Sequence, residues 1–153
     1  MSEPGALDQL RRWFEKSGVP VGDAISREEE LAALEARTGL TLPADFRRYL
    51  LELSPSEENY DLEEGNWWPI ARIRTIPEEY RHDVHHPEVA AASCSYLFFA
   101  DFSIWAWAWA ISCTTDRNRG RVVKIGGSPK DDCFVAENFN AFVETYLRDP
   151  FML

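Results

Sequence analysis

Trp105-Ala106-Trp107-Ala108-Trp109-Ala110-Ile111 decides the fold class, because large and small apolar residues alternate along it without a break. A period of two places successive side chains on opposite faces of a β-strand. We therefore expect a strand from Ser103 to Ser112, joined by a turn at Ala100-Asp101 to a strand at Leu97-Phe98-Phe99. Further short strands are expected at Trp68 to Arg74, Arg121 to Ile125 and Cys133 to Ala136.

The alternation leaves two orientations of this strand open. In the first, Trp105, Trp107 and Trp109 face the core and the alanines lie outside. In the second, the alanines lie beneath helices, and the tryptophans are partly exposed as anchors for a partner. An exposed aromatic face also suits a pocket for a small ligand.

Three helices are expected before the strands. The first is Leu7 to Lys16, in which the apolar residues recur at helical spacing. The second begins with Ser26, which is followed three residues later by Glu29 in the reciprocal N-terminal capping pattern. Gly39 ends it, since glycine readily adopts the left-handed conformation of a helix C-terminus.

A third helix starts with Pro43 at its first position and ends before Pro55. A short helix is expected at Ile76 to Tyr80, and a last helix from about Asn138. Helices, then strands, then a helix predict an α+β fold, in which N-terminal helices and a C-terminal helix pack on one face of a mostly antiparallel β-sheet. The length of 153 residues favours a single domain over residues 1–153.

Charge and composition exclude several classes of function. The net charge of −10 argues against direct binding to nucleic acid or to an anionic membrane. Met1 to Ala6 lacks the cationic and apolar regions of a secretory signal, and we expect the protein to stay in the cytosol. Cys94, Cys113 and Cys133 are too widely spaced for a CxxC site and are expected to be buried or half-buried thiols.

The segment from Tyr49 to Ala71 concentrates negative charge, with six carboxylates and no basic residue. Such a run is either a solvated loop or, beside exposed aromatic residues, a docking surface for a basic protein. The candidate partner-binding residues are Glu57, Glu58, Tyr60, Asp61, Glu63, Glu64, Trp67, Trp68, Asp101, Trp105 and Trp107.

No catalytic, metal or cofactor site is expected. His82 and His86 have the i, i+4 spacing of zinc ligands, but Pro87 follows and no HExxH glutamate is present. No GxSxG motif or phosphate-binding glycine loop occurs. We therefore expect a protein that is not an enzyme.

Four short motifs resemble the SUKH superfamily of Smi/Knr-type domains. The first two are Ile25-Ser26-Arg27-Glu28-Glu29-Glu30-Leu31 and Leu40-Thr41-Leu42-Pro43-Ala44-Asp45-Phe46-Arg47-Arg48-Tyr49-Leu50. The third combines Phe98-Phe99-Ala100-Asp101 with the strand Trp107 to Ile111, and the fourth is the closing segment Val135 to Val143. The resemblance covers about residues 25–150. It departs from the family at Leu53-Ser54-Pro55-Ser56, where an Asn-Gly pair is common.

The resemblance implies an α+β fold without enzymatic activity. Many members of this superfamily are immunity proteins that neutralise a cognate toxin, often a nuclease or deaminase, by direct contact. Others act as interaction hubs in cell-wall regulation. The resemblance therefore implies an immunity protein with a toxin as partner, and the acidic net charge favours a basic toxin. The alternatives are a regulatory scaffold or a small-ligand-binding domain that uses the tryptophan face.

Overall fold

An antiparallel sheet forms the centre of the computed structural model, which describes residues 5–127 and 132–153. Its strands follow the order β1-β2-β4-β5-β6-β7, and β3 pairs with part of β4. Most of Met1 to Ala6 lies outside the described residues. The strands are β1 (Asn59–Tyr60), β2 (Gly65–Trp67), β3 (Arg74–Thr75), β4 (Tyr96–Phe102), β5 (Trp107–Ser112), β6 (Val122–Ile125) and β7 (Cys133–Ala136).

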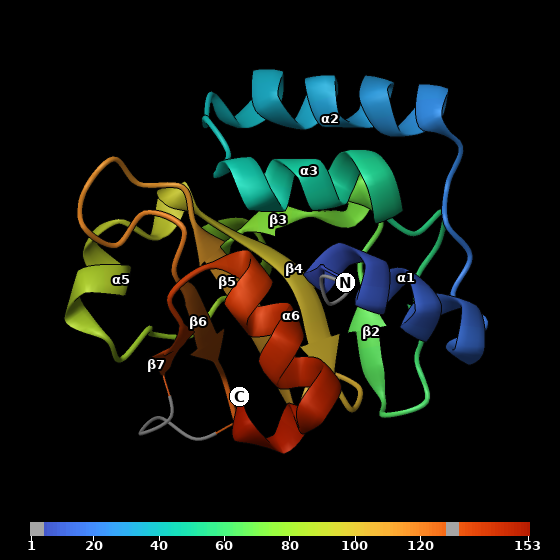
Figure 1. Cartoon of the computed structure of the whole chain (residues 1–153). Coiled ribbons are helices and arrows are strands. Elements are labelled where there is room, and N and C mark those ends of the chain that lie inside the picture. Colours follow the sequence, from blue (N-terminus) through green and yellow to red (C-terminus); the bar gives the residue numbers. More distant parts are fainter. Residues whose placement is uncertain (1–4, 128–131) are drawn as a thin grey trace.

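Helices pack on one face of this sheet, as the sequence predicts for an α+β fold (Figure 1). Ring contacts link Phe14 of α1 to Trp67, Phe46 of α3 to Phe99, and Phe142 of α6 to Trp109. The helix α2 lies on α3 and on the 3-10 turn η1, away from the sheet. The helices are α1 (Ala6–Ser17), α2 (Ala24–Thr38), α3 (Ala44–Leu53), α4 (Ile76–Glu79), α5 (Pro87–Ala91) and α6 (Phe139–Arg148), with 3-10 turns η1 (Ile70–Arg72), η2 (Ser93–Ser95) and η4 (Pro150–Met152).

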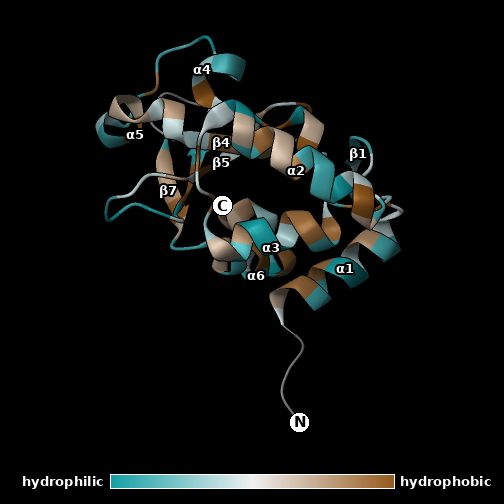
Figure 2. Cartoon of the chain, turned by 90° about the horizontal axis from the view of Figure 1, so that it is seen from above, coloured by the Kyte–Doolittle hydropathy of each residue, from teal (hydrophilic) through white to brown (hydrophobic). Residues whose placement is uncertain are grey.

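Helix amphipathicity explains why α1 and α2 form where they do. Figure 2 shows hydrophilic and hydrophobic segments alternating along both helices, as expected when each buries one face. The buried residues at helical spacing are Ala6, Leu10 and Phe14 in α1, and Leu31 and Leu34 in α2. Gly18 and Gly39 follow these helices in the left-handed conformation, so the predicted stop at Gly39 is confirmed.

Two predicted helix starts were displaced. The capping residue of α2 is Asp23 rather than Ser26: its carboxylate accepts hydrogen bonds of 2.9 Å from the backbone N–H and the hydroxyl of Ser26. Aspartate and serine are about equally good capping residues, so the Ser26–Glu29 spacing alone could not identify the cap. In α3, Pro43 is the capping residue itself, so the helix starts one residue later than predicted.

Two strand predictions were wrong. The segment Trp68 to Arg74 is not one strand, because η1 separates β2 from β3. No turn occurs at Ala100-Asp101, since β4 continues to Phe102 through an irregularity in the pairing between Phe98 and Ala100. The turn lies at residues 103–106, where three consecutive residues adopt positive φ.

The sheet orientation settles the tryptophan question for β5. Trp109 is fully buried against Phe142 and Tyr146 of α6, and Trp107 lies half-buried beside it. Ala108 and Ala110 are buried on the opposite face of the sheet. The orientation that exposes the tryptophans is therefore wrong for Trp109, and the alanines are buried rather than outside as the other orientation had them. Trp105 precedes the strand and lies on the far face.

Candidate functional site

The carboxylate of Asp61 lies inside the protein rather than on an acidic surface. Its Oδ2 accepts hydrogen bonds from Nε1 of Trp13 and Nε1 of Trp67, each at 2.9 Å, and from the hydroxyl of Tyr146 at 2.6 Å. Its Oδ1 accepts from the backbone N–H of Glu63 and of Gly65. Five donors compensate for burying this carboxylate, so Asp61 joins the β1–β2 loop to α1 and α6.

A second buried carboxylate, Asp101, has the same role on the other face of the sheet. Its Oδ2 accepts from Nε1 of Trp68 at 2.7 Å and from Nδ2 of Asn66 at 3.0 Å. Its Oδ1 accepts from the backbone N–H of Trp105 at 3.0 Å. Each predicted aspartate thus receives an indole N–H from the adjacent pair Trp67–Trp68, whose rings point to opposite faces.

The predicted partner-binding set therefore separates into two groups. Asp61, Trp67, Trp68 and Asp101 are buried, and their hydrogen bonds hold the loops together. Their burial contradicts the sequence interpretation of Trp67 and Trp68 as exposed aromatics within an acidic loop. The remaining residues of the set are exposed or half-buried: Glu57, Glu58, Tyr60, Glu63, Glu64, Trp105 and Trp107.

Glu58 belongs to an internal network of charges. Its Oε1 accepts from Nδ2 of Asn66 at 3.1 Å and lies 3.6 Å from Nε of Arg72. The guanidinium of Arg72 lies 3.9 Å from the ring centre of Trp68 and forms a bidentate pair with Glu79. Glu58 is therefore partly neutralised within the chain.

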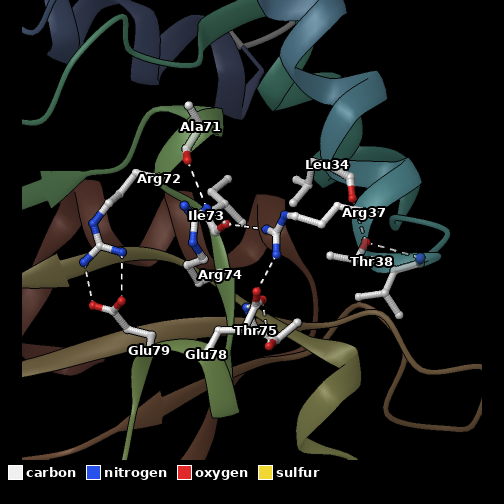
Figure 3. Close-up of polar contacts among 11 residues, drawn as sticks. Leu34, Arg37, Thr38, Ala71, Arg72, Ile73, Arg74, Thr75, Glu78 and Glu79 are labelled. Atoms are coloured by element: carbon white, nitrogen blue, oxygen red, sulfur yellow. Dashed lines mark hydrogen bonds and ion pairs between the residues drawn. The ribbon is translucent and has the colours of Figure 1, made fainter.

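A second polar cluster includes a residue of α2 (Figure 3). Arg37 donates to the carboxylate of Glu78 at 2.5 Å and to the backbone carbonyl of Ile73 at 2.9 Å. Partial burial raises the pKa of Glu78, but the N–H and hydroxyl of Thr75 and the Arg37 guanidinium outweigh it and hold the pKa at about 2. This cluster holds α2 against α4, and its charged groups pair with each other within the chain.

Glu57, Glu63 and Glu64 are different, because no basic side chain among the described residues forms an ion pair with them. All three side chains are exposed. Tyr60, also exposed, lies on the edge strand β1 between Glu57 and the other two. Within the predicted set, the unpaired negative charge therefore lies just before β1 and in the β1–β2 loop.

The β4–β5 turn lies beside that loop. The backbone N–H of Ser103 donates to the carbonyl of Glu64 at 3.0 Å, and Gly65 pairs with Phe102. Ser103, Ile104 and Trp105 have φ angles of 49°, 55° and 60°. This left-handed conformation costs about 1–2 kcal/mol for each residue other than glycine, and it is most unusual for a β-branched side chain such as isoleucine.

Sequence reasoning missed four apolar residues at this end of the sheet. Leu62 is 59% exposed, Ile104 82%, Phe151 68% and Met152 69%. They account for four of the seven large exposed hydrophobic residues in the described parts of the chain. The ring of Phe151 lies 5.3 Å from that of Phe102, which places η4 beside the β4–β5 turn. The sequence offered one signal for this apolar surface, which is the single apolar residue Leu62 between carboxylates.

We call this region the loop-end surface and define it as residues 61–64, residues 103–106 and η4. In Figure 1 the start of β2, the end of β4 and the end of α6 lie at the same, lower end of the molecule. A recess of about 240 Å³ between Glu63 and η4 is lined by Trp13, Leu147 and Phe151, among others. The surface thus combines unpaired carboxylates with exposed apolar side chains.

The predicted ligand pocket on a tryptophan face does not form as expected. Trp109 is part of the core, whereas the Trp105 ring stacks on Tyr80 at 5.9 Å on the other side of the sheet. An open recess of about 560 Å³ is lined by Trp105, Tyr80 and His82, among others. The three tryptophans therefore do not form one aromatic wall.

Other predicted features have no common site. Cys113 is buried, but Cys94 and Cys133 are exposed, contrary to the expectation of buried or half-buried thiols; all three are free. His82 is exposed, whereas His86 is half-buried with its ring 5.1 Å from that of Phe134. Within residues 5–127 and 132–153, no three His, Cys, Asp or Glu side chains are grouped as metal ligands would be. No helix in those ranges is sufficiently long and apolar to cross a membrane.

Comparison with known proteins adds one finding. A family model described as the SMI1 / KNR4 family (SUKH-1) matches residues 26–145 of the chain. This range begins within α2 and ends within α6, so it includes the whole sheet and the loop-end surface except η4. No match was found among curated proteins.

Proposed function

The chain belongs to the SMI1 / KNR4 family (SUKH-1), and from this membership we propose that it is an immunity protein that neutralises a toxin by direct protein–protein contact. Domains of this family are generally non-catalytic, and they include immunity proteins and regulatory domains. We further propose that it acts in the cytosol and that its toxin is basic, such as a nuclease or deaminase.

The observation that carries the proposal is the unpaired negative charge of Glu57, Glu63 and Glu64 beside the exposed Tyr60. A protein that acts on nucleic acid needs a basic cleft. An acidic surface on a chain of net charge −10 would be drawn to such a cleft and could exclude the nucleic acid from it. Electrostatic attraction also speeds association, which suits an inhibitor that must act before its toxin does.

The test is to purify each protein encoded beside this gene, together with the isolated chain, and to measure their dissociation constants at two salt concentrations. We expect nanomolar affinity for one basic neighbour, weaker at the higher salt concentration, and loss of that neighbour's activity in the complex. Weak binding to several unrelated proteins would instead favour a regulatory scaffold. No binding to any neighbour would contradict the proposal.

A further inference from the structure

We propose that Ile104 is an apolar anchor that inserts into a recess within the basic surface of the protein partner. This inference rests on the proposed function and deepens it, because it names the contact that holds the complex after charge has brought the two proteins together.

The conformation of Ile104 is the first step. Its φ of 55° lies in the left-handed region, where the Cβ branch crowds the backbone. Glycine or asparagine adopts this conformation more readily than isoleucine. For folding alone, isoleucine is therefore a poor choice at the tip of the β4–β5 turn.

The neighbours of Ile104 show that the turn is held from both sides without it. Ser103 donates through its backbone N–H to Glu64, and Trp105 donates to Oδ1 of Asp101. The Trp105 ring packs on Tyr80 and on Phe98. These contacts fix the turn in place, while the Ile104 side chain itself is 82% exposed. The fold thus fixes the backbone that carries an apolar side chain, although it buries almost none of that side chain.

Rigid presentation of an apolar side chain favours binding. A β-branched side chain on a fixed backbone has few rotamers, so it loses little conformational entropy when a partner buries it. Apolar anchors of this kind, at the centre of an interface and surrounded by polar groups, carry most of the affinity in many complexes. Ile104 contributes this affinity only when a partner covers it.

Charge complementarity identifies the kind of partner. Glu63 and Glu64 follow Leu62 in the chain, and the Glu64 carbonyl accepts a hydrogen bond from the backbone N–H of Ser103, the residue before Ile104. Neither side chain has an ion-pair partner among the described residues. An apolar anchor within such a rim fits a recess bordered by lysine or arginine side chains, and it would be repelled by an acidic surface.

The experiment compares Ile104→Asn and Ile104→Gly with the wild-type chain. Both replacements tolerate positive φ, and asparagine does so without the added flexibility of glycine. We expect both variants to melt at or above the wild-type temperature, yet to bind the basic neighbour at least about 30-fold more weakly, mainly through faster dissociation. Ile104→Leu, which keeps an apolar side chain, should retain most of the affinity.

Ile25→Asn is the matched control, because Ile25 is 70% exposed but lies on α2, away from the loop-end surface. Its dissociation constant should equal that of the wild type. Unchanged affinity of Ile104→Asn for a neighbour that binds the wild type tightly would overturn the anchor and leave the immunity function standing. Wild-type binding to no neighbour would overturn both. A wild-type dimer in sedimentation that Ile104→Asn abolishes would also overturn the anchor, since a second copy would then cover it.

Discussion

The hydroxyl of Tyr146 on α6 donates a hydrogen bond of 2.6 Å to Oδ2 of Asp61 in the β1–β2 loop. Burial and the adjacent Asp61 charge both raise the pKa of Tyr146, so its proton stays in place over the whole physiological range. Because Trp13 and Trp67 donate to the same oxygen, one carboxylate connects two helices and the sheet to the loop that carries Glu63 and Glu64. The exposed charges are thus held in position by a buried one.

Replacing Asp61 by alanine should destabilise the protein strongly. The substitution leaves the indole N–H groups of Trp13 and Trp67 and the Tyr146 hydroxyl without their acceptor, and it removes two bonds that shape the loop. We expect the free energy of unfolding to fall by about 4 kcal/mol. Glu63→Ala, two residues away and exposed, should change it by less than about 0.5 kcal/mol. Urea unfolding measures both, and equal effects would contradict the structural role of Asp61.

Gly65→Ala tests the close approach of the loop to α6. A Cβ at position 65 would lie 1.9 Å from the hydroxyl oxygen of Tyr146 and 3.0 Å from Oδ2 of Asp61. Relieving this overlap requires a shift of the buried ring or of the strand, and we expect a loss of about 2–3 kcal/mol. In a Tyr146→Phe background the same substitution should cost less, because the closest atom is gone. Additive costs in this double-mutant cycle would show that the two residues do not meet.

Trp105 and Trp109 should respond very differently to truncation. Trp109 is fully buried among aromatic rings of α6 and β4, so Trp109→Ala should lower the free energy of unfolding by about 3–5 kcal/mol. Trp105 is half-buried on the far face, and Trp105→Ala should cost less than half as much. Comparable losses from the two variants would contradict the assignment of the two rings to different faces.

These tryptophans also show how much of the fold could be predicted from sequence. The α+β class, the antiparallel strands and the helical faces follow from periodicity, because burial on one face imposes it directly. The end of β4 was misplaced, since the left-handed turn at Ser103 to Trp105 contains no glycine and continues the alternation of Trp107 and Trp109. A local pattern cannot reveal a backbone conformation that distant residues, such as Glu64 and Asp101, hold in place.

The candidate site was predictable only in part for a related reason. Composition identifies the acidic segment, but it cannot separate Asp61, which accepts five hydrogen bonds inside the fold, from Glu63, which faces solvent. That distinction depends on donors from α1 and α6, 48 and 85 positions away from Asp61 along the chain. The apolar part of the loop-end surface likewise emerges only when three separate segments meet.

Glu78 predicts a specific loss of stability in acid. Despite the opposing effect of burial, Thr75 and Arg37 hold its pKa in the folded protein at about 2, below the ordinary value of 4.5. A carboxylate whose pKa is lower in the folded state contributes stability above its unfolded pKa and loses that contribution as the pH falls toward the folded pKa. The window is therefore pH 4.5 down to about 2.

The measurement compares Glu78→Gln with the wild type by urea unfolding from pH 7 to pH 2. Because the side chain is 39% exposed, we expect only about 1 kcal/mol of difference at pH 7, shrinking toward zero at the acidic limit. Glu144→Gln, an exposed residue on α6 without an ion pair in the described part of the chain, should follow the wild-type curve. A Glu78→Gln difference that is constant with pH would exclude this linkage.

Reversing the charge of Glu63 and Glu64 together tests whether the β1–β2 loop steers a basic partner. The double variant Glu63→Lys, Glu64→Lys keeps the backbone bonds of the loop, because Asp61 and Ser103 contact only main-chain atoms of these residues. Association with the basic neighbour should therefore slow by on the order of tenfold at low salt, with a flatter salt dependence and an unchanged melting temperature. The control, Glu28→Lys with Glu29→Lys on α2, changes the net charge of the chain by the same amount at a distance from the loop-end surface. If the two double variants slow association equally, the whole charge of the protein attracts the partner and the loop has no special part. If neither slows it, electrostatic steering is excluded.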